Sequence, residues 1–166
     1  MWKQKELILV KHIELFEAFK GKKMRDPNLH TLSGIALIVE DKILLVHAKK
    51  YLNQNNKWSI PKGHIEGDSL ESALKELEEE TGVLLDKDFD EKMEYHYVKG
   101  GVDKLMDVYI YYRDKSEFSE YLNRWTIKPK YYDVDEIIGA KFFDLSTAAR
   151  KKIDIAMIDL LDKIEE

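Results

Sequence analysis

The chain has 166 residues, of which 44% are hydrophobic, a formal net charge of −5 and no cysteine. That length suits a single domain with its own core. The lack of cysteine excludes disulfides, thiolate metal sites and a cysteine nucleophile.

The negative net charge and the lack of long apolar runs further limit the classes of protein to which the chain can belong. A protein that binds nucleic acid by neutralising phosphates is normally basic, whereas an acidic enzyme can take a polyphosphate if metal ions carry the positive charge. No apolar run approaches the roughly 18 residues of a membrane span, and no small-residue cleavage site follows the N-terminus. We therefore expect a cytoplasmic protein without a signal peptide.

Residues 6–19 carry apolar side chains at helical spacing, which predicts a helix or a strand followed by a helix. Gly21 and Pro27 then mark a link to the rest of the chain. We expect residues 1–30 to be an N-terminal extension of one domain that spans residues 1–166. The extension either packs on the core or acts as the arm of a homodimer.

Two apolar runs follow, at residues 33–40 and 43–48, with Asp41 and Lys42 between them. This pattern predicts a hairpin of buried strands. Lys49 and Lys50 stand at its exit, where they could reach phosphates or simply be solvated.

A loop and a helix come next. Pro61, Gly63 and Gly67 mark the loop, Asp68 is a suitable N-cap, and Gly82 supplies the C-terminal stop. The helix is therefore predicted to run to about residue 81. Its core-facing stripe is Leu70, Leu74, Leu77 and Thr81.

The opposite face of this helix carries Glu76, Glu79 and Glu80 at spacing i, i+3, i+4. Three like charges on one patch repel one another, and a solvated surface tolerates that at small cost. A divalent cation turns the repulsion into coordination, because Mg²⁺ prefers carboxylate and phosphate oxygens. The alternatives are a metal–phosphate site and an ordinary acidic surface.

The second half of the chain predicts strands at residues 92–99 and 106–112 around Gly100-Gly101, an irregular stretch at 114–132 and a strand at 137–143. Ser146 and Thr147 are expected to cap a final helix. Its apolar face would be Ala149, Ile153, Ala156, Leu160 and Ile164. The order of elements favours an α+β fold or a three-layer α/β/α arrangement.

The stretch Lys75-Glu76-Leu77-Glu78-Glu79-Glu80-Thr81-Gly82-Val83 resembles the closing half of the sequence box of the Nudix hydrolases, with lysine in place of the usual arginine. Gly63 resembles the glycine that opens the box. The spacing from Gly63 to Lys75 is two residues shorter than the family pattern, and Asp68 stands roughly where the first glutamate belongs.

The resemblance implies a Nudix-type α/β/α sandwich with a mixed sheet and the hydrolysis of a nucleoside diphosphate linked to another group. It implies Mg²⁺, with Mn²⁺ as a possible substitute, held by Glu76, Glu79 and Glu80 and by the backbone carbonyl of Lys62 or Gly63. One of the glutamates would double as general base. Lys75 would take the place of the arginine that orients them.

The segment from Trp58 to His64 is similar to that of diadenosine tetraphosphate and diphosphoinositol polyphosphate hydrolases. The resemblance implies substrate contacts for Trp58, Lys62 and His64, the last two with phosphates. Tyr131 and Tyr132 are candidates to stack on an adenine. Each of these residues has a plainer reading as a packing or loop residue.

A loop beyond the box often supplies one more glutamate in this family. Asp133, Asp135 and Glu136 lie in such a loop here, and the sequence does not choose among them. We expect dinucleoside polyphosphates as substrates, with RNA 5′ ends and nucleoside triphosphates as alternatives. A non-catalytic module that binds a nucleotide or a protein is favoured by the shortened box and by Lys75, whereas the three retained glutamates favour an enzyme.

Overall fold

The computed structural model describes residues 30–146 and 152–165. The expected extension at residues 1–29 and the expected helix cap at Thr147 lie outside these ranges. Within them, no helix is long and apolar enough to cross a membrane.

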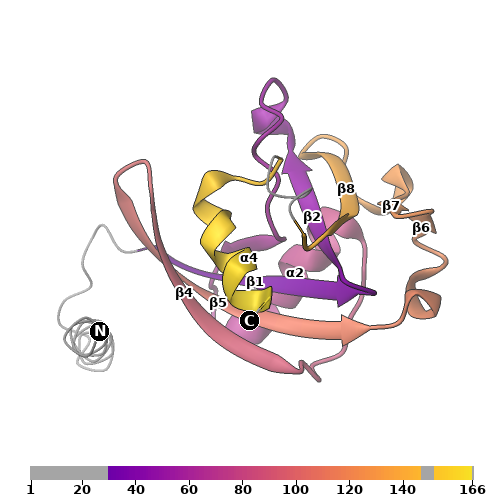
Figure 1. The fold of residues 1–166 in the computed structure, drawn as a ribbon, viewed down its shortest axis with the longest axis horizontal. Coiled ribbons are helices and arrows are strands. Elements are labelled where there is room, and N and C mark those ends of the chain that lie inside the picture. The colour runs from indigo at the N-terminus through magenta and orange to yellow at the C-terminus, as the bar shows by residue number, and fades with distance from the viewer. Residues whose placement is uncertain (1–29, 147–151, 166) are drawn as a thin grey trace.

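A mixed sheet of eight strands organises the described chain (Figure 1). Its spatial order is β4-β5-β1-β2-β8-β7-β6, and β3 pairs with β1 beside β2. Among the strand pairs of residues 30–146, β1–β5 is the only parallel one. The strands are β1 (His30–Val39), β2 (Lys42–Ala48), β3 (Lys62–His64), β4 (Glu91–Lys99), β5 (Val102–Arg113), β6 (Leu122–Asn123), β7 (Thr126–Ile127) and β8 (Ile137–Asp144).

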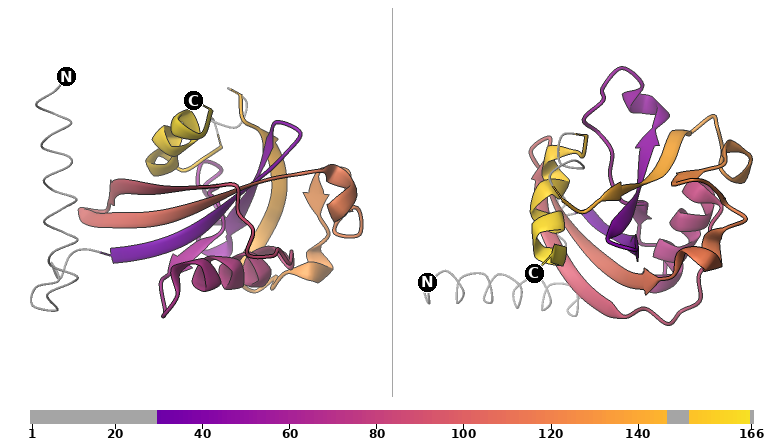
Figure 2. Two further views of the ribbon diagram at one scale, coloured as in Figure 1. Left: turned by 90° about the horizontal axis from the view of Figure 1, so that it is seen from below. Right: turned by 45° about the vertical axis from the view of Figure 1, so that its right-hand side comes forward.

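Two α-helices cover opposite faces of this sheet. Helix α2 (Ser69–Thr81) packs on one face and α4 (Ile158–Glu165) on the other, as the left view of Figure 2 shows. Short 3₁₀ turns η1 (Lys49–Tyr51), η2 (Lys115–Phe118), η3 (Pro129–Tyr131) and η4 (Ile155–Met157) lie in the connections. The expected α+β class and the α/β/α layering are confirmed.

The layering follows from strand periodicity, because successive side chains of a strand point to opposite faces. In β1, Ala36 and Ile38 belong to the core cluster under α4, while Ile35 and Leu37 belong to the cluster under α2. Such strands are buried on both faces, so they read as continuous apolar runs. Replacing Ile35, Leu37 or Ile38 by alanine is expected to cost about 2–5 kcal/mol of stability, as in comparable cores.

Helix α2 begins and ends where its sequence predicts. The Asp68 side chain accepts a hydrogen bond of 2.9 Å from the backbone N–H of Glu71, which caps the first turn. Gly82 ends the helix at φ 78°. Leu77 and Thr81 are fully buried on the core side, which confirms the predicted stripe.

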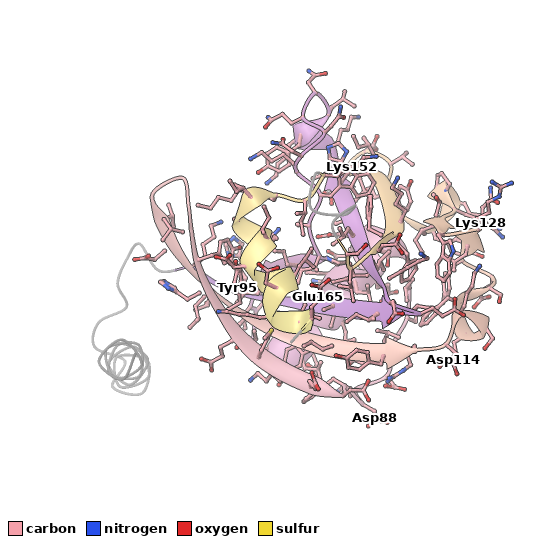
Figure 3. The ribbon with its side chains drawn as sticks, viewed as in Figure 1. Asp88, Tyr95, Asp114, Lys128, Lys152 and Glu165 are labelled. Atoms are coloured by element: carbon pink, nitrogen blue, oxygen red, sulfur yellow. The ribbon has the colours of Figure 1, made fainter. Side chains whose placement is uncertain are left out.

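The final helix is shorter than its apolar pattern predicts. Ile153 forms a β-bridge with Trp58, and Ala156 lies in η4, so neither belongs to α4. The reason is local: the Asp154 side chain accepts from the backbone N–H of Ala156, and this cap starts a new turn there. The Tyr95 hydroxyl, labelled beside α4 in Figure 3, donates to the Ala156 carbonyl and holds that turn on β4.

Candidate active site

Glu76 and Glu80 lie together on the side of α2 that faces the loop at Gly63, and they share a hydrogen bond. Burial raises the pKa of Glu80 to about 8, and the neighbouring Glu76 adds to the rise. Burial also raises the pKa of Glu76, with repulsion from Glu79 as the next cause. Both carboxyls therefore keep a proton to higher pH than an ordinary glutamate does, which reduces the repulsion between them.

Strand β3 holds the backbone of the loop against this pair. Ser33 of β1 pairs with Gly63, and a β-carbon on Gly63 would lie only 2.3 Å from the Glu76 carboxyl. A glycine is therefore needed here for the loop to approach the helix so closely. This contact gives Gly63, predicted to open the box, a defined structural role.

Lys62 lies beside Glu80 with its side chain turned inward. Its Nζ donates a 2.9 Å hydrogen bond to Ser59 Oγ, and its backbone hydrogen-bonds the Glu80 carboxyl. Burial lowers the pKa of Lys62 to about 8, against the opposing attraction of Glu80. A cation and a protonatable carboxyl are thus placed together, an arrangement that often marks functional sites.

Glu79 faces a different hollow from Glu80. Its carboxylate is 3.8 Å from Nζ of Lys75, one turn earlier on the exposed surface of α2. These two residues, with Glu76 and His64, line a surface hollow of about 400 Å³. Lys75 therefore pairs with Glu79, while Glu71, one turn before Lys75 on the helix, pairs with Lys87 at 2.9 Å.

The donor set suits a hard divalent cation, which takes carboxylate oxygens. Glu76 and Glu80 form a partly buried, hydrogen-bonded pair whose negative charge a cation would neutralise. Glu79 is turned to Lys75, and in residues 30–146 and 152–165 no three acidic or histidine side chains are grouped closely enough to hold a metal ion. The structure therefore joins Glu76 and Glu80 by a hydrogen bond, while Glu79 lies beside Glu76 and pairs with Lys75.

A cavity of about 280 Å³ opens on the other side of Glu80. We call it the lysine cavity, because five lysines line it. Its charged and aromatic lining residues are Lys50, Lys57, Lys62, Lys99, Lys104, Glu80, Asp154, Tyr51 and Tyr97. His64 and Gly63 lie at its rim, so the structure brings the predicted Lys62 and His64 to this cavity.

Of the three loop acids, two lie near the helix glutamates. Asp135 and Glu136 line a surface hollow together with Glu80, and Glu136 also raises the pKa of Glu76 as a minor cause. Asp133 instead closes its own turn, since its side chain accepts from the backbone N–H of Asp135 at 2.8 Å. The structure thereby separates candidates that the sequence leaves equal.

Trp58 is placed in packing rather than on the lining of the lysine cavity. Its ring lies 4.9 Å from that of Phe143 and 5.1 Å from that of His47, between centroids. Its backbone bridges Ile153, and its indole lies against Gly139. The tryptophan joins the box loop to β8 and to the C-terminal segment.

Tyr131 and Tyr132 belong to the packing on the α2 side of the sheet. The Tyr131 ring meets Tyr121 edge-on at 5.0 Å, and its carbonyl oxygen lies only 2.3 Å from where a β-carbon on Gly82 would be. Neither tyrosine lines the lysine cavity. Their stacking on a base stays a prediction, as does substrate contact by Trp58.

Sequence reasoning missed Lys57, Lys99, Lys104 and Asp154. They come from the loop after η1, from β4, from β5 and from the segment before η4, so only the fold brings them together. Asp154 is 3% exposed and holds Nζ of Lys99 at 2.5 Å. An aspartate breaking the apolar pattern of the expected last helix was the available signal.

Several solved structures share this architecture. An Ap4A hydrolase of C. elegans, solved as a binary complex, is 19% identical, with 82% of this chain and 95% of that chain covered and a TM-score of 0.60. The NUDIX domain of Shewanella oneidensis NrtR, complexed with ADP ribose, is 14% identical over 92% of this chain and 96% of that one, with a TM-score of 0.61.

A third similar structure is the bifunctional NMN adenylyltransferase/ADP ribose pyrophosphatase of Francisella tularensis, complexed with AMP and a Mn ion. It is 17% identical over 97% of this chain but 48% of that chain, with a TM-score of 0.56. No curated protein sequence matches. The family model described as NUDIX domain matches residues 29–164, and the chain belongs to this family.

Proposed function

We propose that this protein is a pyrophosphohydrolase that acts on nucleoside diphosphate-linked substrates, with dinucleoside polyphosphates preferred, and uses Mg²⁺ or, in its place, Mn²⁺. One observation carries the proposal: Glu80, which is hydrogen-bonded to Glu76, lies in the wall of a cavity lined by five lysines. Carboxylates for a cation and cations for phosphates are thus adjacent, as phosphoanhydride chemistry requires.

Glu76 and Glu80 would hold the metal, and Glu79 would join them on leaving Lys75. A bound divalent cation neutralises charge on the phosphate oxygens and lowers the pKa of a water molecule. Glu79 lies close to Glu76, since the two line one surface hollow and Glu79 contributes to the raised pKa of Glu76. Glu136, at the shared hollow, is our candidate for the further loop carboxylate.

The chain's own groups would manage substrate and proton. Lys62 and His64 would orient the phosphates. A glutamate carboxylate would take the proton from the attacking water. The oxygen of that water then bonds to phosphorus while the bridging P–O bond breaks. The leaving phosphate departs with the bridging oxygen. Lys75 would pair with Glu79 while the site is empty and release that carboxylate when a metal binds.

The preference for long phosphate chains is supported by the cavity's charge. A chain of four or more phosphates would reach beyond the glutamates into the lysine cavity, whereas a triphosphate would leave part of it empty. Contacts remote from the reacting bond can position the reacting phosphorus. Nucleoside diphosphate-linked substrates in general are supported by the Ap4A hydrolase, the ADP ribose pyrophosphatase and the ADP ribose complex among the similar structures.

The test is hydrolysis of diadenosine tetraphosphate, ATP, ADP-ribose and 5′-triphosphorylated RNA, each with Mg²⁺, with Mn²⁺ and with EDTA. We expect metal-dependent turnover that is fastest on the tetraphosphate. Lys62→Ala and His64→Ala are expected to lower kcat/KM more on the tetraphosphate than on ATP. Equal losses on both substrates would contradict a role in reading chain length.

A second candidate is a NUDIX-fold module that binds a nucleotide without cleaving it. Its specific support is the orientation of Glu79, which is paired with Lys75 instead of joining Glu76 and Glu80. Such a module would bind nucleotides yet release no product with any metal. Retained binding and no turnover in both wild type and Glu80→Gln would favour it.

A further inference from the structure

The lysine cavity has more positive charge than its own carboxylates offset. Five lysines face two acids there, in a protein whose net charge is −5. Both acids are engaged: Glu80 shares a hydrogen bond with Glu76, and Asp154 binds Lys99. Among the described residues, no carboxylate forms an ion pair with Lys50, Lys57 or Lys104.

Three of these ammonium groups surround one aromatic ring. The Nζ atoms of Lys50 and Lys99 each lie 5.1 Å from the centre of the Tyr51 ring, and that of Lys57 lies 5.8 Å from it. The ring attracts each cation, which lets like charges gather. Because the ring carries cations, Tyr51 does not offer a bare face for a base to stack on.

A buried hydroxyl provides the second, independent observation. Tyr97 is 6% exposed and lines the lysine cavity, and its hydroxyl has no hydrogen-bond partner within the described part of the chain. Leaving a buried donor unsatisfied costs about 1–3 kcal/mol. This phenol is protonated at neutral pH, because the ordinary pKa of tyrosine is about 10 and burial raises that of Tyr97 to about 12. The hydroxyl is therefore a donor that a ligand acceptor would satisfy.

The position of Lys99 is fixed rather than free. One carboxylate oxygen of Asp154 accepts a hydrogen bond from Nζ of Lys99, and the other accepts one from the backbone N–H of Ala156. Asp154 is itself buried, so its position follows from the packing of the C-terminal segment. At least one cation of the cavity is thus held in place before any ligand arrives, which lowers the entropic cost of binding.

We infer that the lysine cavity is a metal-independent binding site for a compact polyphosphate group, held by Lys50, Lys57, Lys99 and the Tyr97 hydroxyl. The cavity is small, about 280 Å³, against roughly 300–1,000 Å³ for pockets of drug-sized ligands, so it suits linked phosphates better than a nucleoside. The inference rests on the proposed function for the idea that these phosphates belong to the substrate. It adds that they bind without the metal.

The test is isothermal titration of the full-length protein with inorganic tripolyphosphate in EDTA, at constant ionic strength. We expect saturable one-to-one binding. Lys57→Gln should weaken it roughly tenfold, as loss of a charge-assisted hydrogen bond does, and Lys57→Arg should restore most of it. Tyr97→Phe should weaken binding while thermal stability holds or rises, because the unsatisfied hydroxyl is removed.

Lys130→Gln is the matched control, since Lys130 also lies over a tyrosine ring, at 5.1 Å from Tyr131, but outside the cavity. It should leave affinity within about twofold of wild type. An equal loss in Lys130→Gln, competition by adenosine, or no binding in EDTA would overturn the inference.

The two proposals fail separately. Tripolyphosphate binding in EDTA without hydrolysis of any nucleotide would support this site and contradict the pyrophosphohydrolase. Metal-dependent hydrolysis with no tripolyphosphate binding in EDTA would do the reverse.

Discussion

Glu76 and Glu80, one helical turn apart on α2, share a hydrogen bond, and burial raises the pKa of both. Glu79, between them in sequence, pairs with Lys75 and lines a surface hollow with Glu76. The three glutamates that the sequence presents as one cluster therefore have two different environments. We therefore expect substitutions of Glu79 and Glu80 to have similar effects on catalysis and different effects on stability.

We expect Glu80→Gln and Glu79→Gln each to lower Mg²⁺-dependent turnover at least about tenfold. Glu80→Gln should also hold or raise the melting temperature of the metal-free protein, because a buried ionisable group is replaced by a neutral one. Glu79→Gln should leave it nearly unchanged, since exposed ion pairs contribute little. Calorimetry with and without Mg²⁺ measures both, and the stabilisation by metal should shrink in each variant. Full turnover in both variants would contradict the metal site.

Lys75→Arg should be tolerated and should hold or raise kcat/KM. Lys75 approaches Glu79 at 3.8 Å on the surface, and arginine offers a planar fork that binds a carboxylate through two hydrogen bonds. Steady-state kinetics on the best substrate is the measurement. A fall of more than about tenfold, equivalent to ~1.4 kcal/mol, would show that the lysine ammonium itself is required.

Two glycine substitutions should have opposite signatures. In Gly63→Ala the new methyl meets the end of the Glu76 side chain, which can move aside, so we expect a stability change below about 1 kcal/mol with a clear loss of turnover. In Gly82→Ala the methyl meets the backbone of Tyr131, and φ is 78°, so we expect a loss of roughly 1–3 kcal/mol. Urea unfolding and kinetics on the same samples compare them. A stable, fully active Gly63→Ala protein would contradict the close contact with Glu76.

The Asp154–Lys99 pair should make stability depend on pH at the acid end. Burial alone would raise the pKa of Asp154, but hydrogen bonds from Lys99 and from the Ala156 backbone outweigh it and hold that pKa below its ordinary value. A carboxyl whose pKa is lowered by folding stabilises the protein above its unfolded pKa of about 3.9, and this stabilisation is lost as the pH falls below that value.

Asp154→Asn tests this linkage. At pH 7 it should cost about 1–3 kcal/mol, because Lys99 loses its charged partner. The difference in melting temperature between wild type and variant should narrow between pH 5 and pH 3, at roughly the unfolded pKa. His96→Gln, at the more exposed His96–Asp103 pair, serves as a comparison that leaves Asp154 intact. A gap that stays constant through this range would contradict the assigned pKa shift.

The sequence predicts what short-range signals define. The limits of α2 follow from Asp68 and Gly82, and the strands β1 and β2 follow from apolar runs, so the structure confirms them within a few residues. Strands β3, β6 and β7 have two or three residues and no usable period, which is why the sequence does not predict them. The last helix is mispredicted because its apolar spacing continues through Asp154, whose cap begins a separate turn.

The candidate site also contains residues that the sequence predicts and residues that only the fold brings together. The glutamates are adjacent on one helix, so their spacing alone predicts a shared face. Lys57, Lys99 and Asp154 are separated by dozens of residues and meet only through the sheet and the C-terminal segment. Glu79 belongs to the predicted cluster, but its direction depends on where Lys75 lies, and spacing does not determine that.

Gly82 lies where helix α2, which carries Glu80, meets the segment that leads to the loop carrying Glu136. Its missing side chain lets the end of α2 lie directly on the Tyr131 backbone, two residues before the turn that leads to Asp135 and Glu136. The helix carrying Glu80 and the loop carrying Glu136 are thereby fastened to each other at one point. A larger residue at position 82 would push the Tyr131 backbone away from the helix. We expect this to increase the distance between Glu80 and Glu136 while leaving both side chains in place.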